Sequence, residues 1–509
     1  MTDRRSGPPI GVVVFVVGTA SLGAEIAAAR LLAPWFGAST IVWANTIATV
    51  LLSLSVGYAV GGRVADRDPT PAGLARIVLI AAALLALVPF VSGPFLRTSV
   101  DALESVSAGA FVGSLLGVSV LLAVPLVLLG MVSPYAIRLT VDSVEEAGRA
   151  AGRLYALSTL GSLTGVFGAT LLLIPLIGSR RTFIVFALLL ALVAVPWLRT
   201  RRLAGGAVPL AMVGLLALPV GTLKSAGGER VLWERETEYQ YARVVETPGG
   251  ERRLELNEGQ AVHSLYRAGT VLTGNYWDEQ LVLPFAGARP APRRVAILGN
   301  AAGTTARAIG HYAPETLIDG VEIDPELTKV GRELFDLRAP RLRTHTADAR
   351  PWLHATDDRY DAIVVDAYRQ PYIPFYLATR EFFALVRDRL EPGGVVIVNV
   401  GHPERSDALE KVLAATMRAA FGADRVWRDP SEPVNTMLVA TASAVPPADA
   451  LRAHLPSLPD EIRPIAAATA DRLEPARRGG RVYTDDVAPV EWLIDASIVD
   501  VAADGEPVG

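Results

Sequence analysis

Acidic side chains stand at the ends of predicted strands in the second half of the chain. Glu322, Asp348 and Asp366 each close or follow such a segment, and an earlier segment ends at Gly299 in a turn of small residues. Helical periodicity between the segments predicts a doubly wound, mostly parallel sheet, in which ligands bind beyond the carboxyl ends of the strands. The candidate site residues would therefore meet at one edge. The predicted strands cover residues 295–299, 317–323, 343–347, 362–366 and 395–400.

The residue types at this edge suit a nucleoside. The turn from Gly299 to Gly303 would let a ligand approach backbone amides. Glu322 follows Gly299 by 23 residues, about where a Rossmann-type acid binds both ribose hydroxyls. Asp348, which precedes Ala349, could accept a hydrogen bond from an adenine amino group. We therefore predict that these five residues bind a nucleoside.

The first half of the chain has a different composition. The whole chain is 51% hydrophobic and 20% charged, but residues 1–224 carry 16 basic and 9 acidic groups, against 32 and 43 in residues 225–509. Long uncharged runs in the first part predict seven transmembrane helices, most of them near the roughly 20 residues needed to cross a bilayer. A lipid bilayer is thus an expected partner. The runs cover residues 6–24, 31–62, 77–96, 105–137, 154–179, 182–198 and 203–223.

Positive charge predicts the orientation of these helices. Eleven arginines lie at the N-terminus and in alternate loops, against three on the opposite face, which places the N-terminus in the cytoplasm. Seven crossings would then put the second half outside, whereas the nucleoside that it is expected to bind would be supplied by the cytoplasm. We therefore expect the second half to be a cytoplasmic domain of a multi-pass membrane protein, with the run at 203–223 as the most doubtful crossing. Glu25 and Arg30 lie within the first helix, where they need partners or form part of a substrate or proton pathway.

Composition excludes several kinds of chemistry. The chain has no cysteine, which rules out disulfides, thiolate metal sites and cysteine nucleophiles. Its six histidines show no metal-binding spacing, so no metal is expected. Neither half is strongly basic, so no nucleic acid is expected as a partner.

Three domains are predicted. Residues 1–224 form the multi-pass transmembrane domain, residues 225–284 a small antiparallel β domain around a turn at residues 248–250, and residues 285–509 the Rossmann-like domain.

The second half resembles the S-adenosylmethionine-dependent methyltransferase fold, and more narrowly the spermidine synthase family of aminopropyltransferases. In the first half, Gly62 to Arg67 resembles the loop motif between helices 2 and 3 of major facilitator transporters. The whole chain resembles the membrane-fused spermidine synthase-like proteins of bacteria. The narrower resemblance rests on Tyr239-Gln240, Gln260, Tyr276 with Pro284, the run from Tyr360 to Asp366, and Thr379-Arg380-Glu381-Phe382-Phe383 ahead of Leu390-Glu391-Pro392-Gly393-Gly394.

The resemblance implies roles for particular residues. Gln240, Glu322 and Asp348 would hold the nucleoside of decarboxylated S-adenosylmethionine, the co-substrate, and Asp366 would be the catalytic carboxylate. An amine acceptor must lose a proton before it becomes nucleophilic, and a carboxylate within hydrogen-bond distance can accept that proton. Tyr276 and Tyr368 would contact this small amine. The resemblance also allows a homodimer.

The chain departs from the family at three positions. Ala302 replaces an acid of the first loop, Arg369 replaces the second acid after Asp366, and Trp277 replaces a polar residue after Tyr276. Losing two acids and gaining a cation should weaken the binding of a dicationic amine, which argues against putrescine as the acceptor. Two alternatives stay open: a methyltransferase using S-adenosylmethionine, and a transporter or sensor that binds a nucleoside or polyamine without turnover.

Overall fold

The computed structural model divides the chain into two compact units. One comprises residues 1–104 and 108–225 together with Glu234–Ala242, and the other contains most of the remaining chain, including Arg243–Gly509. The expected domain limits at 224 and 284 stay predictions. The structure describes residues 7–37, 40–103, 109–141, 143–198, 202–218, 223–224, 228–257, 261–368, 373–404, 406–441, 443–494 and 496.

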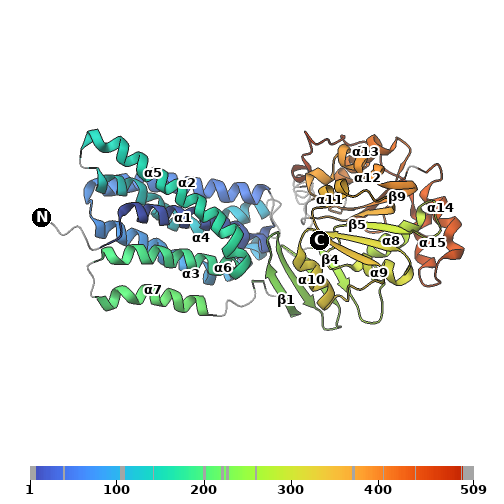
Figure 1. Cartoon of the computed structure of the whole chain (residues 1–509), viewed down its shortest axis with the longest axis horizontal. Coiled ribbons are helices and arrows are strands. Elements are labelled where there is room, and N and C mark those ends of the chain that lie inside the picture. The colour runs from blue at the N-terminus through green and yellow to red at the C-terminus, as the bar shows by residue number, and fades with distance from the viewer. Residues whose placement is uncertain are drawn as a thin grey trace. The chain divides into compact units, whose positions relative to one another are not determined.

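Apolar helices that lie side by side make up the first unit (Figure 1). Five stretches are long and apolar enough to cross a membrane, so the expected helical region is confirmed, but the count of seven crossings is not. The last stretch, Val144–Trp197, has 54 residues, and its chain leaves helical geometry at Gly178 (φ 82°). The helices are α1 (Ile10–Phe36), α2 (Thr40–Arg67), α3 (Pro71–Leu103), α4 (Gly109–Thr140), α5 (Val144–Gly168), α6 (Ile174–Ala194) and α7 (Arg202–Ala217).

Two glycines of α5 allow it to pack directly on α1. A Cβ at Gly161 would lie 2.0 Å from the carbonyl oxygen of Phe15, and one at Gly165 would lie 2.1 Å from that of Thr19. Small residues allow such backbone contacts between helices in a bilayer, where the hydrophobic effect does not drive association. The two helices therefore run parallel and in close backbone contact.

The segment Glu234–Ala242 is the tip of the hairpin formed by β1 (Arg230–Glu236) and β2 (Tyr241–Glu246), and it belongs to the helical unit. It contacts α1 near its C-terminal end and α6 near its N-terminal end. The amide of Ser179 donates to Glu236 at 2.6 Å, and Arg30 donates to the carbonyl oxygen of Glu238. Arg30 thus has a partner 208 residues away in the chain. Glu25 is buried inside α1, with 8% of its surface exposed.

The second unit begins with a four-stranded sheet in the order β1-β2-β3-β4. The expected turn between β2 and β3 is present, and Gly250 adopts φ 80° there, a left-handed conformation that suits glycine. The small antiparallel sheet expected from the sequence is therefore confirmed. Its strands are β1 (Arg230–Glu236), β2 (Tyr241–Glu246), β3 (Arg252–Leu256) and β4 (Val262–Tyr266).

An eight-stranded mixed sheet follows, in the order β12-β10-β11-β9-β8-β5-β6-β7. The strands β5 to β9 pair in parallel, while β10, β11 and β12 form an antiparallel edge. The Rossmann-like sheet predicted from the sequence is confirmed. Its strands are β5 (Arg294–Leu298), β6 (Leu317–Glu322), β7 (Leu342–Thr346), β8 (Tyr360–Val365), β9 (Leu390–Gly401), β10 (Val426–Asp429), β11 (Asn435–Thr441) and β12 (Glu474–Pro475).

Helices cover both faces of this sheet (Figure 1). Ala296 and Leu298 of β5 point into one core, while Val295 and Ile297 point into the other, as the two-residue period of a strand requires. The first core contains α11 (Ala349–Ala355), α12 (Arg380–Asp388) and α13 (Ala408–Phe421). The second contains α8 (Trp277–Val282), α9 (Thr304–Tyr312), α14 (Pro447–His454) and α15 (Arg463–Arg472).

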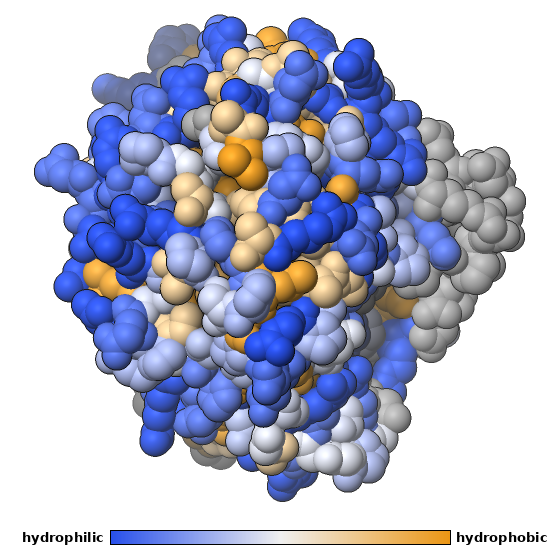
Figure 2. Space-filling model, turned by 90° about the vertical axis from the view of Figure 1, so that its right-hand side faces the viewer, coloured by the Kyte–Doolittle hydropathy of each residue, from blue (hydrophilic) through white to orange (hydrophobic). Residues whose placement is uncertain are grey.

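The two units differ in what they expose. Hydrophilic residues cover most of the face in Figure 2, which belongs to the second unit, with apolar residues scattered among them. The first unit exposes large apolar side chains, among them Leu52 (68% exposed) and Leu210 (72%). Extensive apolar exposure marks a surface that contacts something other than water.

Candidate active site

The predicted turn after β5 has the geometry that its glycines suggest. Gly299 adopts φ 90°, and a Cβ there would lie 2.4 Å from the carbonyl oxygen of Asp366. Gly303 adopts φ 88°, and a Cβ there would lie 2.0 Å from Leu337 Cδ1. Both positions therefore require glycine for backbone and packing reasons. Their contact with a nucleoside stays a prediction.

Glu322 lies at the end of β6 and faces the same turn. Its Oε2 accepts a hydrogen bond from the Ala301 amide at 2.8 Å, and its Oε1 accepts one from the Asp324 amide at 3.0 Å. Burial raises the pKa of Glu322 to about 7, and the nearby Asp324 carboxylate adds to this effect. The side chain is therefore fixed at the strand end, where protonation near neutral pH would change its hydrogen-bonding capacity.

Asp348 begins the helix that follows β7. Its Oδ1 accepts from the Arg350 amide at 3.1 Å and caps α11, while its Oδ2 accepts from the Tyr376 hydroxyl at 2.7 Å. Ala349, the first residue of α11, is buried. The cap alone explains an aspartate here, so the adenine-binding role of Asp348 and Ala349 stays a prediction.

Two side-chain amides hold the carboxylate of Asp366. Gln280 Nε2 donates to Asp366 Oδ2 at 2.8 Å, and Asn399 Nδ2 donates to Asp366 Oδ1 at 2.8 Å. Thr305 and Asn435 hold these amides in turn, because the Thr305 hydroxyl donates to Gln280 Oε1 at 2.5 Å and Asn435 Nδ2 donates to Asn399 Oδ1 at 2.8 Å. Each oxygen of Asp366 is thus oriented by a fixed amide.

The ionisation of Asp366 reflects two opposing effects. Burial raises the pKa of its carboxyl, while the hydrogen bonds from Gln280 and Asn399 lower it. Burial is the larger effect, and the result is a stronger base than a solvated aspartate. Among the described residues, Asp366 forms no ion pair, so these amides orient its negative charge without neutralising it.

Two tyrosines lie beside Asp366. The Tyr368 hydroxyl donates to the Asn399 carbonyl oxygen at 2.7 Å and accepts from the Gly401 amide at 2.7 Å. Burial and the Asp366 carboxylate raise the pKa of both Tyr276 and Tyr368. Both phenols are therefore neutral at physiological pH. The structure thus brings together Tyr276, Asp366 and Tyr368, the three residues that the sequence predicts around the amine acceptor.

Not every predicted residue can be placed at this site. Gln240 lies in the turn before β2 and belongs to the first unit, where its backbone amide donates to Thr237 Oγ1 at 3.1 Å. Its role toward the nucleoside stays a prediction. Ala302 is buried in the turn after β5, and Trp277 is buried on α8. Arg369 and Gln260 lie outside the described residues.

The sequence-based prediction missed Gln280 and Asn399, although each leaves a signal. Asn399 is the single polar residue in a strand segment that is otherwise apolar from Val395 to Val400. Gln280 follows Tyr276 by four residues, which is a neighbouring position on a helix surface. A fully buried amide needs a hydrogen-bond partner, and for both residues that partner is Asp366.

Comparison with known proteins identifies the domain that carries this site. Residues 279–427 match the family model of the spermine/spermidine synthase domain. The chain contains a spermine/spermidine synthase domain. This match covers Gln280, Glu322, Asp348, Asp366 and Asn399, and the resemblance seen in the sequence is thereby confirmed at the level of the domain. The resemblance of the first half to major facilitator transporters is not confirmed.

Relatives of the synthase domain are polyamine aminopropyltransferases by name. A probable polyamine aminopropyl transferase of Bifidobacterium longum is 36% identical over 191 residues, which make up 37% of this chain and 42% of that protein. A polyamine aminopropyltransferase of Vibrio vulnificus is 30% identical over 35% of this chain and 60% of its own length. The chain thus spans less than two thirds of either protein.

A third relative is similar beyond the synthase domain. Polyamine aminopropyltransferase 2 of Ralstonia nicotianae is 24% identical over 449 residues, covering 82% of this chain and 83% of that protein. Residues 225–509 number only 285, so the similarity extends into the helical region. Among solved structures, a probable spermidine synthase from Corynebacterium glutamicum is 23% identical, covers 50% of this chain and 98% of that chain, and has a TM-score of 0.38.

Proposed function

We propose that this chain is a membrane-anchored aminopropyltransferase. It would transfer the aminopropyl group of decarboxylated S-adenosylmethionine to a small amine. The observation that carries the proposal is the geometry of Asp366, whose two oxygens are oriented by Gln280 and Asn399 and lack a cationic partner among the described residues. An ammonium group supplies the missing charge.

The proposed chemistry uses Asp366 as a general base. The carboxylate attracts the ammonium of the acceptor and takes one proton from it. The amine nitrogen then attacks the carbon beside the sulfonium, a carbon–nitrogen bond forms, and the carbon–sulfur electron pair leaves with sulfur as a neutral thioether nucleoside. A base of raised pKa suits this step because it competes better for the ammonium proton. Alignment of the two substrates supplies further rate.

Glu322 would hold the co-substrate for this reaction. Its carboxylate, already bonded to two backbone amides at 2.8 and 3.0 Å, has further lone pairs that can accept the two ribose hydroxyls. Glu322 is the last residue of β6 and Asp366 follows β8, and both strands pair with β5. Nucleoside and acceptor would therefore meet at the same edge of the sheet.

The direct test incubates the purified full chain with decarboxylated S-adenosylmethionine and a panel of amines. Mass spectrometry should show an amine that gains an aminopropyl group together with the thioether nucleoside. Methyl transfer from S-adenosylmethionine instead would replace the proposal with the methyltransferase alternative. Binding of both ligands without any product would favour a sensor or transporter.

We also propose that the chain crosses the bilayer an odd number of times. Trp197 Nε1, after α6, donates to the Pro8 carbonyl oxygen at 3.1 Å, so α6 ends beside the N-terminus. The backbone amide of Leu223, after α7, donates instead to Glu234 at 2.9 Å, in the hairpin that contacts Ser179 and Arg30. The helix α7 therefore connects opposite ends of the unit. Combined with the arginine asymmetry, this supports an outer location for the synthase domain, contrary to the cytoplasmic location expected from co-substrate supply.

Reporter fusions test this topology. A reporter that is active only outside the cytoplasm should be active when fused after Gly509 and also when fused next to Arg97, because both positions share one side. Fusion after Arg138 should be silent. Activity next to Arg97 with silence after Gly509 would show an even number of crossings and return the synthase domain to the cytoplasm.

A further inference from the structure

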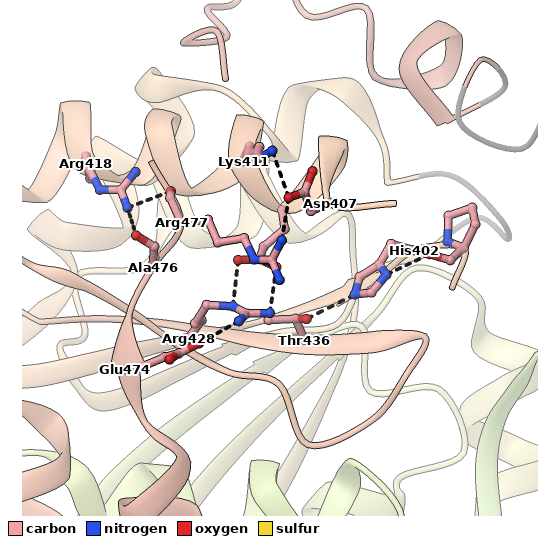
Figure 3. Close-up of polar contacts among 11 residues, drawn as sticks. His402, Asp407, Lys411, Arg418, Arg428, Thr436, Glu474, Ala476 and Arg477 are labelled. Atoms are coloured by element: carbon pink, nitrogen blue, oxygen red, sulfur yellow. Dashed lines mark hydrogen bonds and ion pairs between the residues drawn. The ribbon is translucent and has the colours of Figure 1, made fainter. Parts of the chain in front are cut away.

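A buried cluster in the second unit shows how this protein treats charges that leave water. Arg428 lies between Glu410 and Glu474, with nitrogen–oxygen distances of 2.8 and 2.7 Å. Beside them, Asp407 contacts Arg477 at 2.5 Å. Figure 3 shows these pairs. Pairing of this kind offsets the cost of removing a charge from water, so a buried acid without a partner is the informative case.

Glu25 is such an acid in the helical unit. It lies near the middle of the apolar span Ile10–Phe36, and 8% of its surface is exposed. Within the described parts of α1 to α7 it is the single buried acid, and none of the described residues forms a hydrogen bond or ion pair with its side chain. Arg30 lies about 140° further around α1 and donates to Glu238. Ionisable groups in such positions mark ion or substrate pathways.

The face of α1 that carries Glu25 lies against two other helices. Gly18 and Leu32 lie seven residues before and after Glu25, so all three share one side of the helix. Gly18 packs on the backbone of α5 at Ser158, and Leu32 packs on Gly117 of α4. The helices α4 and α5 also contact each other. Glu25 therefore faces the place where α1, α4 and α5 meet.

A wider helical turn lies level with Glu25 on the α5 side. It is the π-helix η1 (Ala169–Leu173), whose closing hydrogen bond spans five residues in place of four, and it contacts α1. Thr19 packs on Gly165, and the two helices run parallel. Glu25 is six residues beyond Thr19, and η1 is four to eight residues beyond Gly165, so both lie at one depth. Turns of this kind occur frequently at functional sites.

A proline of α4 lies at nearly the same depth. The helices α1 and α4 run antiparallel, because Leu32 packs on Gly117 and Phe36 packs on Gly113. Seven residues back along α1 from the first of these contacts lead to the buried carboxylate, and eight residues forward along α4 lead to Pro125. Pro125 has no amide hydrogen, so the carbonyl oxygen four residues earlier loses its helical donor. Interrupted membrane helices use such carbonyl oxygens to coordinate cations.

These surroundings match a primary alkylammonium. Such a group has one positive charge and three N–H donors, which a carboxylate and nearby carbonyl oxygens can accept. The buried side chains at this depth of α1 and α4 are aliphatic, and they suit the alkyl chain of an amine better than a hydrated metal ion. A single buried acid also matches a single positive charge. The aliphatic residues include Ala24, Ala28, Leu121 and Leu122.

We propose that the helical unit binds the ammonium group of an alkylamine at Glu25, between α1, α4 and η1. The unit then has an amine-binding role of its own, in addition to anchoring the chain. The inference uses no residue of the synthase domain, so it does not depend on aminopropyl transfer. Amine binding at Glu25 in a chain without transferase activity would uphold it and refute the proposed reaction.

Equilibrium dialysis of the full chain in lipid nanodiscs against radiolabelled 1-aminobutane tests the site, with binding to empty nanodiscs subtracted. Glu25→Gln should weaken binding at one site about tenfold or more, the loss of a hydrogen bond to a charged group. Glu145→Gln, which removes an exposed acid at the start of α5, should bind as the wild type does. Sodium ions at the concentration of the amine should not displace it. Unchanged binding in Glu25→Gln, or displacement by sodium, would overturn the inference.

Two proline variants test the backbone contribution while Glu25 stays in place. Pro125→Ala returns an amide hydrogen to α4, so the freed carbonyl oxygen regains its helical donor. Amine binding should then weaken about fivefold, the loss of one hydrogen bond. Pro134→Ala makes the same change nine residues further along α4 and should leave binding unchanged. Equal effects of the two variants, or no effect of Pro125→Ala, would overturn the proposed site between α1 and α4.

Discussion

Asp366→Asn should lower turnover by about 10²-fold or more while nucleoside affinity stays nearly unchanged. The variant keeps the shape of the side chain but loses the negative charge and the proton acceptor. Its amide would also point an N–H toward Gln280 Nε2 or Asn399 Nδ2, both of which donate to the wild-type carboxylate. We expect that mismatch to cost about 1 kcal/mol of stability, too little to unfold the domain.

The measurement is single-turnover transfer with both substrates saturating, together with a melting curve. Asp424→Asn, at an exposed position before β10, removes the same charge far from Asp366 and should transfer at the wild-type rate. Burial raises the pKa of Asp366. Wild-type turnover should therefore fall when the pH drops below this raised pKa, and turnover of the variant should not show this fall. A variant that melts normally and transfers at near wild-type rate would show that Asp366 is not the base.

Glu322→Gln should weaken binding of the thioether nucleoside by about 1–3 kcal/mol, which is the value of a hydrogen bond to a charged group. An amide offers only one acceptor oxygen to the ribose, and its N–H₂ faces the donating amides of Ala301 or Asp324. Calorimetry on the full chain measures this change. Glu333→Gln, on the exposed surface of α10 (Pro325–Leu334), serves as the control, and unchanged nucleoside affinity in Glu322→Gln would remove Glu322 from the site.

The same residue predicts a pH dependence. With the pKa of Glu322 raised to about 7, nucleoside affinity should decline below pH 7 as the carboxyl gains a proton and loses an acceptor. Without ligand, the folded state binds this proton more tightly than the unfolded state, whose pKa is near 4.5. The stability contribution of Glu322 is therefore present below about pH 4.5 and is lost as the pH rises to about 7. In Glu322→Gln, this pH dependence of nucleoside affinity and this contribution to the pH dependence of stability should both vanish.

Local sequence was sufficient to predict the strands and the acids at their ends. Asp366 follows a continuous apolar run, as a strand covered on both faces does, and Glu322 closes a mainly apolar segment that contains Asp319. Parallel strands end at a shared edge, so separate local patterns point to one site without knowledge of contacts.

Tertiary structure alone decided which residues surround these acids. Gln280 lies 86 residues from Asp366 in the chain and Asn399 lies 33 residues away. Neither contact can be predicted from a local periodicity of the sequence, because both depend on how α8 and β9 pack against β8. The same holds for Arg30, whose partner Glu238 lies 208 residues further along the chain, between β1 and β2. Burial of a polar side chain forces it to find a hydrogen-bond or ionic partner, but the topology of the chain determines which residue that partner is.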